Sequence, residues 1–295
     1  MSTAKNVLIA LIILLVGLPV GVYSGNNKGT KKVLIIGIDG CRPDALLKAK
    51  TPNIDQLWQN GAYSFKAKTD ELSSSGICWT SMLTGVWHGK HQVVSNAYKH
   101  PNVEEYPHFF RRIKQEKPAL KTYSIVNWKP IHAILQENDA TVAKRRLFDR
   151  WVAGKAARAL KRKEVDVMYV QLDEVDHAGH TYDFSPDSPE YLQAIEKSDR
   201  QVGKILRGLY KRSSYADENW LIIVTTDHGG SNYMHGENIP DHTTVFYMAS
   251  GNDVEKGEIV GPVQVVDVAV TALAYLGVNP DEKWKLDGKI VGLKQ

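Results

Sequence analysis

The chain has 295 residues, of which 43% are hydrophobic and 24% are charged, and its formal net charge is +4. This composition is typical of a folded globular protein and excludes a collagen-like chain, a disordered chain and a disulfide-rich scaffold. So small a positive charge does not indicate nucleic-acid binding, and the sequence has neither zinc-finger spacing nor a phosphate-binding glycine loop. We therefore expect a folded protein without a nucleic-acid-binding motif.

The amino terminus carries an apolar run over residues 7–23, preceded by one positive charge at Lys5 and followed by the small residues Ser24 and Gly25. The run is shorter than the roughly 20 apolar residues of a spanning helix. This order predicts a secretory signal peptide over residues 1–24, and the alternative is a short membrane anchor. The protein is then secreted or periplasmic, or tethered to a membrane through residues 7–23 if the signal is not cleaved.

The remainder of the chain alternates between two patterns. Continuous apolar runs rich in β-branched residues predict strands that are buried on both faces, and helical patterns lie between them. The alternation predicts an α/β fold of three layers, α/β/α, with a mostly parallel central sheet, and we expect one domain over residues 31–295. The predicted strands are residues 33–38, 122–127, 165–172, 220–226 and 244–249, and the predicted helices are residues 54–60, 103–115, 142–163, 191–210 and 263–276.

Acidic and imidazole side chains follow several of these strands. Ligands of open α/β sheets bind at the carboxyl ends of the strands, so these side chains should converge on one edge. Carboxylates and neutral imidazoles together are ligands of zinc, and mixed oxygen and nitrogen sites also accept manganese or iron. Two such ions about 4 Å apart can hold both oxygens of an in-line displacement. The candidate ligands are Asp39, Asp176, His180, Asp227, His228 and His242.

A nucleophile is predicted at Ser75, in the stretch S-S-S-G-I-C-W-T-S-M-L-T-G over residues 73–85. A serine before a glycine at a helix start can place its oxygen beside a metal while backbone N–H groups face an anion. The alternative is that the serines of residues 73–75 only cap the helix. Cys78 is a rival nucleophile, although no histidine lies near it in the sequence.

Five motifs, in order, resemble the alkaline phosphatase superfamily and, within it, the type I phosphodiesterase/nucleotide pyrophosphatase branch. The resemblance spans about residues 31 to 290. The motifs are I-G-I-D-G-C-R-P-D (36–44), T-P-N-I-D-Q-L-W-Q-N-G (51–61), S-G-I-C-W-T-S-M-L-T-G-V-W-H-G-K-H (75–91), D-H-A-G-H (176–180) and T-T-D-H-G-G (225–230).

The resemblance implies two divalent metal ions, zinc first, with manganese or iron as alternatives. One ion would be held by Asp39, Ser75, Asp227 and His228, and the other by Asp176, His180 and a further histidine. His242 fits the H-T pattern of the superfamily and His235 fits the H-G form of the phosphodiesterase branch. We favour His242.

Two residues are predicted to bind substrate. Cys78 stands where the family often has an asparagine that holds the phosphoryl oxygen, and Asn96 is the second. Since Asp39 and Ser75 should meet at one metal, Cys41 and Cys78 should lie near each other, and a Cys41–Cys78 disulfide is a hypothesis.

The predicted function is metal-dependent hydrolysis of phosphodiester or pyrophosphate bonds through a phosphoseryl intermediate, with a small-molecule phosphate ester as substrate. A phosphomonoesterase or a phosphonate hydrolase on the same site is the alternative. A sulfatase would need a C/S-x-P-S/A-x-R motif, and the chain lacks its proline and arginine after Ser75. An inactive binding relative is the alternative from a different class.

Overall fold

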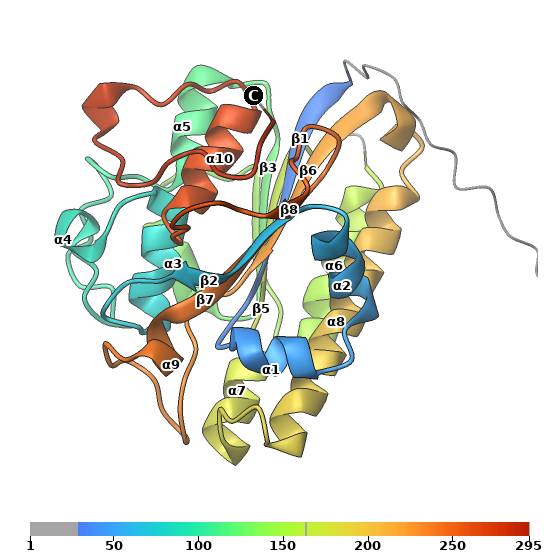
Figure 1. Cartoon of the computed structure of the whole chain (residues 1–295). Helices are drawn as coiled ribbons and strands as arrows, with labels where there is room; N and C mark the ends of the chain where they lie inside the picture. The colour runs from blue at the N-terminus through green and yellow to red at the C-terminus, as the bar shows by residue number, and fades with distance from the viewer. Residues whose placement is uncertain (1–28, 163, 295) are drawn as a thin grey trace, which may run out of the picture.

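The computed structural model describes residues 29–162 and 164–294, and its centre is an eight-stranded sheet (Figure 1). The strands lie side by side in the order β4-β3-β5-β1-β6-β7-β2-β8. All neighbouring pairs are parallel except those of β7 with β6 and with β2. The strands are β1 (Thr30–Ile38), β2 (Ala62–Lys68), β3 (Thr122–Val126), β4 (Val142–Arg145), β5 (Val167–Leu172), β6 (Glu218–Thr225), β7 (Thr244–Ser250) and β8 (Gly257–Glu258).

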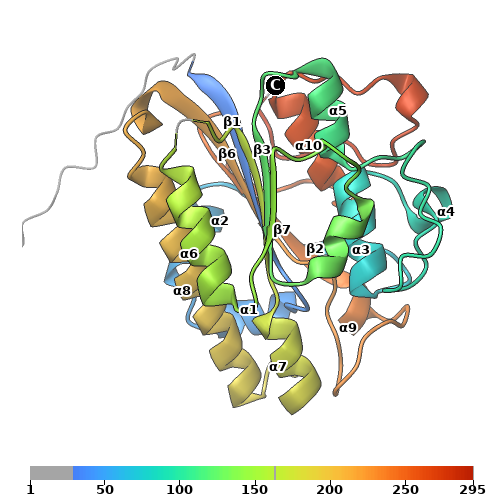
Figure 2. The ribbon, with the colours of Figure 1, turned by 180° about the vertical axis from the view of Figure 1, so that it is seen from behind.

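Helices cover both faces of this sheet, as Figures 1 and 2 show from opposite sides. One face carries α1 (Pro43–Lys48), α2 (Pro52–Gln59), α6 (Asp149–Leu160) and α8 (Pro189–Tyr210). The other carries α3 (Ser75–Thr84), α4 (His88–His91), α5 (Phe109–Glu116) and α10 (Asp267–Tyr275). Near the carboxyl ends of the parallel strands lie α7 (Glu174–Tyr182) and α9 (Pro240–Thr243). Short 3-10 helices span Lys129–Ile134, Tyr215–Asp217 and Glu282–Trp284.

The two layers of helices pack on separate hydrophobic cores because side chains alternate across a strand. On β1, Val33 and Ile35 join the core under α3, α5 and α10. Leu34 and Ile36 point the other way and join the core under α6 and α8. The central strand is therefore apolar on both faces, and this explains its continuous apolar sequence.

The predicted three-layer α/β fold with a mostly parallel sheet is confirmed, and its five predicted strands correspond to β1, β3, β5, β6 and β7. Two helix predictions were wrong at their starts. The helix predicted over residues 103–115 begins only at Phe109, as α5. Residues 142–145 form the edge strand β4, and α6 begins only at Asp149. The strands β2 and β8 were not predicted.

The amino-terminal prediction cannot be compared with the structure. The signal peptide or anchor predicted over residues 1–24 lies outside the described residues. Within residues 29–162 and 164–294, no helix combines the length and apolar character that a membrane span requires.

Candidate metal and phosphoryl-transfer site

Asp39 is the first residue after β1, and two polar side chains hold its carboxylate. The indole Nε1 of Trp79 donates to Asp39 Oδ2 at 2.8 Å, and Gln171 Nε2 donates to the same oxygen at 2.9 Å. The Trp79 ring lies so close to Gly37 that a Cβ there would stand 2.3 Å from the indole. Oδ2 is thus committed to hydrogen bonds, and Oδ1 faces Ser75 and His228.

Ser75 is the first residue of α3, and its hydroxyl points into the same space. Ser75 Oγ lies 3.1 Å from His228 Nε2 and 3.5 Å from Asp39 Oδ1. Asn96 lies beside it, since its Oδ1 accepts the Gly76 N–H at 2.8 Å. The helix dipole of α3 adds partial positive charge at Ser75, which suits an anion there.

Asp227 and His228 follow β6 and are fully buried. Asp227 Oδ1 accepts the Gly40 N–H at 3.2 Å, and Asp227 Oδ2 lies 3.4 Å from His228 Nε2. Asp39, Asp227 and His228 form one group of side chains that could hold a metal ion.

Asp176 and His180 lie one turn apart on α7, with His180 Nε2 3.4 Å from Asp176 Oδ2. The approach of α7 to β1 requires a glycine at position 40, where φ is +60° and a Cβ would stand 2.6 Å from Asp176 Oδ1. Asp149 fixes the start of α7, because its carboxylate accepts the N–H groups of Asp173 and Glu174 at 2.9 Å each.

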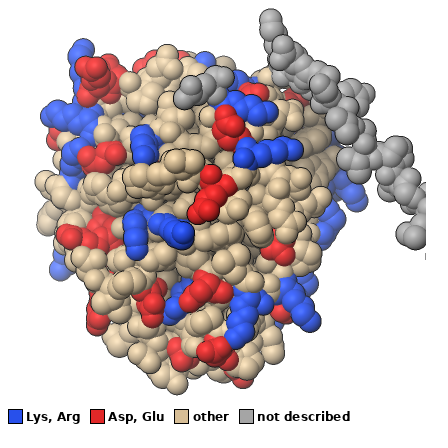
Figure 3. Space-filling view, viewed as in Figure 1, with Lys and Arg blue, Asp and Glu red and all other residues tan. Residues whose placement is uncertain are grey.

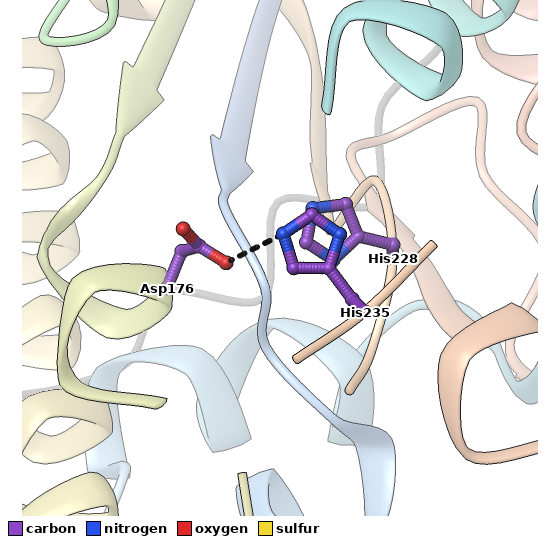
Figure 4. Close-up of side chains that lie close together, drawn as sticks. All are labelled: Asp176, His228 and His235. Carbon is purple, nitrogen blue, oxygen red and sulfur yellow. Dashed lines mark ion pairs between the residues drawn. The ribbon is translucent and has the colours of Figure 1, made fainter. Parts of the chain in front are cut away.

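The third histidine beside Asp176 is His235. Its Nε2 lies 3.7 Å from Asp176 Oδ1 and 3.1 Å from His180 Nε2, and its ring stacks on His228 with centroids 3.8 Å apart (Figure 4). The structure does not bring the favoured residue, His242, into this cluster. His242 Nδ1 accepts the Glu237 N–H at 3.1 Å, so its Nε2–H donates to Ser231 Oγ at 2.8 Å.

The three histidines of the cluster have a proton on the ring nitrogen opposite to that of His242. In each, Nδ1 lies 2.7–2.9 Å from a backbone carbonyl, which can only accept, so Nδ1 carries a proton. All three Nε2 atoms face the carboxylates. The pairs are His180 with the Tyr233 carbonyl, His228 with that of Gly229 and His235 with that of Ser73.

Burial keeps two of these imidazoles neutral. It lowers the pKa of His228 to about 3 and, together with the neighbouring His228, lowers the pKa of His235 to about 2. The Nε2 lone pair of His235 therefore faces His180 Nε2 at 3.1 Å. Such an arrangement is suited to a cation that both nitrogens bind, and hydrogen bonds from Nδ1 are the usual support of a metal-binding histidine.

The carboxylates of the cluster are also arranged as metal ligands would be. Asp176 Oδ1 and Asp227 Oδ2 are buried without a hydrogen-bond partner among the described residues. Burial raises the pKa of both well above the ordinary value, and the charge of Asp39 raises both further. Burial also raises the pKa of Asp39 itself to about 6, against the lowering effect of the Trp79 and Gln171 hydrogen bonds. Unpaired buried carboxylates beside imidazole lone pairs fit divalent metal ions.

Two predicted features are not part of the cluster. Cys78 is fully buried and its Sγ faces the Leu72 carbonyl at 3.7 Å. Our proposals therefore give it no role as a substrate contact or nucleophile. Burial also raises the pKa of its thiol well above the ordinary value. The hypothesised disulfide is absent, since Cys41 and Cys78 are both free.

Sequence reasoning missed Gln171, Asp149 and the role of Trp79. Gln171 is a polar residue inside the apolar run of β5, and this contrast was the available signal. Its Oε1 also accepts the N–H groups of Asn127 and Trp128, so one amide ties Asp39 to the end of β3.

The fold is one that solved structures of phosphodiesterases and sulfatases share. The model of one family, type I phosphodiesterase/nucleotide pyrophosphatase, matches residues 33–144 and 127–285. The chain belongs to this family.

Named relatives agree with this assignment. The chain is 25% identical to ectonucleotide pyrophosphatase/phosphodiesterase family member 7 of Rattus norvegicus over 246 residues, 75% of this chain and 55% of the relative. It thus spans about half the length of such curated relatives.

Solved structures share the fold. Murine ectonucleotide pyrophosphatase/phosphodiesterase 5, as an inactive variant in complex with AMP, superposes with a TM-score of 0.68 at 15% identity, covering 84% of this chain and 95% of that one. A 2-O GAG sulfatase gives a TM-score of 0.69 at 14% identity, covering 88% and 73%.

The crowded carboxylates make a prediction about stability. In the presence of a chelator, Asp227→Asn should unfold at a higher temperature than the wild type. Its free energy of unfolding should be greater by about 1–3 kcal/mol. The substitution removes a buried charge and retains an oxygen that can accept the Gly40 N–H.

Thermal and urea unfolding with and without added zinc would measure this. The control is Asp241→Asn, at an exposed aspartate, which should change little. A chelated Asp227→Asn protein less stable than the wild type would contradict the prediction.

Proposed function

We propose that the protein is a two-metal hydrolase that cleaves phosphodiester or pyrophosphate bonds through a phosphoseryl intermediate. One observation carries the proposal. The Ser75 hydroxyl stands at the start of α3, 3.1 Å from His228 Nε2 and 3.5 Å from Asp39 Oδ1. Serine is a weak nucleophile on its own, and a metal ion held by neighbouring carboxylates and imidazoles can activate it.

Two sets of side chains would hold the ions. Asp39, Ser75, Asp227 and His228 form the inner set, and Asp176, His180 and His235 form the outer set. When bound, the ions would favour the alkoxide of Ser75 and neutralise charge on the phosphoryl group and the leaving oxygen. The mixed carboxylate and imidazole donors support zinc, with manganese or iron as alternatives.

The chain's own residues position the reacting groups. Ser75 Oγ forms a bond to phosphorus as the leaving group departs with the bonding electron pair and gains a proton. Water then attacks phosphorus, the Ser75 Oγ–P bond breaks, Ser75 takes a proton from that water, and the remaining phosphate monoester leaves. The helix dipole of α3 favours the negative oxygens. Asn96, whose Oδ1 is engaged by Gly76, directs its Nδ2 donors to a phosphoryl oxygen in our proposal.

Nucleotide-type substrates are supported by two comparisons, the family model and the AMP complex of the murine relative. Because the chain covers about half of its curated relatives, the activity of the whole protein is part of the proposal. Export, expected from residues 1–24, also stays a prediction.

Three chromogenic esters would test the reaction class. We expect the highest kcat/KM on a p-nitrophenyl nucleotide diester, lower values on a p-nitrophenyl monoester and no turnover of p-nitrophenyl sulfate. A preference for the monoester would refute the diesterase assignment, and turnover of the sulfate would refute the reaction class.

Ser75→Ala should abolish turnover, by about a thousandfold or more, while the fold and metal content persist. The metal stays because Asp39, Asp227 and His228 remain. Ser74→Ala is the matched control, since the Ser74 side chain makes no capping hydrogen bond to α3. Near-normal activity of a fully metal-loaded Ser75→Ala protein would show that another residue is the nucleophile.

His235→Asn and His242→Asn should behave differently. His235→Asn should lose one of about two ions per chain and most activity, because it removes a lone pair facing Asp176. His242→Asn should keep both ions. Only its free energy of unfolding should fall, because the hydrogen bonds of His242 to Ser231 and Glu237 are lost. Metal analysis after gel filtration measures both, and the reverse outcome would restore His242 as the ligand.

A further inference from the structure

The junction between β4 and α6 carries an exposed basic and aromatic patch. We call it the β4–α6 patch. Three large apolar side chains are well exposed there: 56% of Leu147, 44% of Phe148 and 45% of Trp151. The patch consists of Lys144, Arg145, Arg146, Leu147, Phe148, Arg150 and Trp151.

The aromatic side chains of this patch form a small ordered unit. The rings of Phe148 and Trp151 meet edge to face, with centroids 4.7 Å apart. The Arg150 guanidinium lies 5.1 Å from the Phe148 ring and 5.3 Å from the Trp151 ring. Neither ring belongs to the two hydrophobic cores or to the partly buried residues packed against them. About half of each ring is therefore left to water, at a cost that burial against a partner would remove.

The positive charges of the patch are also uncompensated. Within residues 29–162 and 164–294, no ion pair involves Lys144, Arg145, Arg146 or Arg150. On the face seen in Figure 3, by contrast, basic and acidic side chains are interspersed. Rings with apolar bodies, flanked by long cationic side chains, match the boundary between lipid headgroups and acyl chains.

The patch lies at the same end of the molecule as the candidate site. Asp149, between Phe148 and Arg150, is buried and caps α7, the helix that carries Asp176 and His180. Figure 2 shows the amino-terminal end of α6 and the helix α7 at the same end of the sheet. A surface that covered the patch would therefore lie beside the mouth of the site.

We propose that the β4–α6 patch docks the protein on an anionic phospholipid bilayer, with the carboxyl edge of the sheet turned toward the lipid surface. Phe148 and Trp151 enter the interface, and the arginines pair with lipid phosphates and carboxylates. Each basic side chain near such a surface contributes about 1 kcal/mol. The docking does not depend on the hydrolytic function proposed above.

Vesicle sedimentation of the full chain would test the proposal. We expect stronger binding to phosphatidylcholine vesicles containing phosphatidylserine than to phosphatidylcholine alone, and weaker binding at high salt. Arg146→Gln combined with Arg150→Gln should lower partitioning to the anionic vesicles roughly thirtyfold. Phe148→Ser combined with Trp151→Ser should lower it on both vesicles. Residues 7–23 are present in every variant, so their contribution cancels in these comparisons.

The control is Val260→Ser combined with Ile290→Ser, which removes two exposed apolar side chains elsewhere and should bind as the wild type does. All variants should hydrolyse a soluble substrate at the wild-type rate, because none of the replaced residues lies in the site. Equal binding of the patch variants and the wild type would overturn the proposal. Binding of the wild type to heparin or DNA but not to anionic vesicles would overturn the lipid as the partner.

Discussion

The constraint on which this structure depends is the burial of three like charges in one small space. Asp39, Asp176 and Asp227 come from three different segments, and each is more stable as a neutral acid than an exposed aspartate would be. Asp39 receives side-chain hydrogen bonds from Trp79, Gln171 and Ser75. These buried, poorly paired carboxylates lower the stability of the protein at this edge of the sheet. Such destabilising features are typical of functional sites.

The surrounding residues orient the donor atoms of the cluster for ligand binding. Backbone carbonyls hold a proton of His180, His228 and His235 on Nδ1, so all three Nε2 atoms face the carboxylates. Gly40 allows α7 to approach β1 closely enough for the cluster to form. Donors of this kind are preorganised, and a ligand need not reorient them when it binds.

The sequence was sufficient for the fold class because buried parallel strands have continuous apolar runs. It was insufficient for β4, because an edge strand that is exposed and basic has no apolar run, and its residues merged with the helix that follows. The carboxylates, His180 and His228 were predicted from their places after strands, and the structure brings them close together. The choice between His235 and His242 depends on which ring nitrogen carries a proton, and this is set by carbonyls and N–H groups that spacing does not reveal. Cys78 lies one turn after Ser75, but it is fully buried and its Sγ faces the Leu72 carbonyl, a contact that motif alignment does not reveal.

The antiparallel direction of β7 has its own consequence. In a parallel crossover the chain must leave the carboxyl edge and return along a helix, but between β6 and β7 it stays at that edge throughout. The connection that contains Asp227, His228, His235 and His242 is therefore not bound by the geometry of the sheet. Insertions could lengthen it without moving a strand, so a new specificity could arise there in evolution while the fold is unchanged.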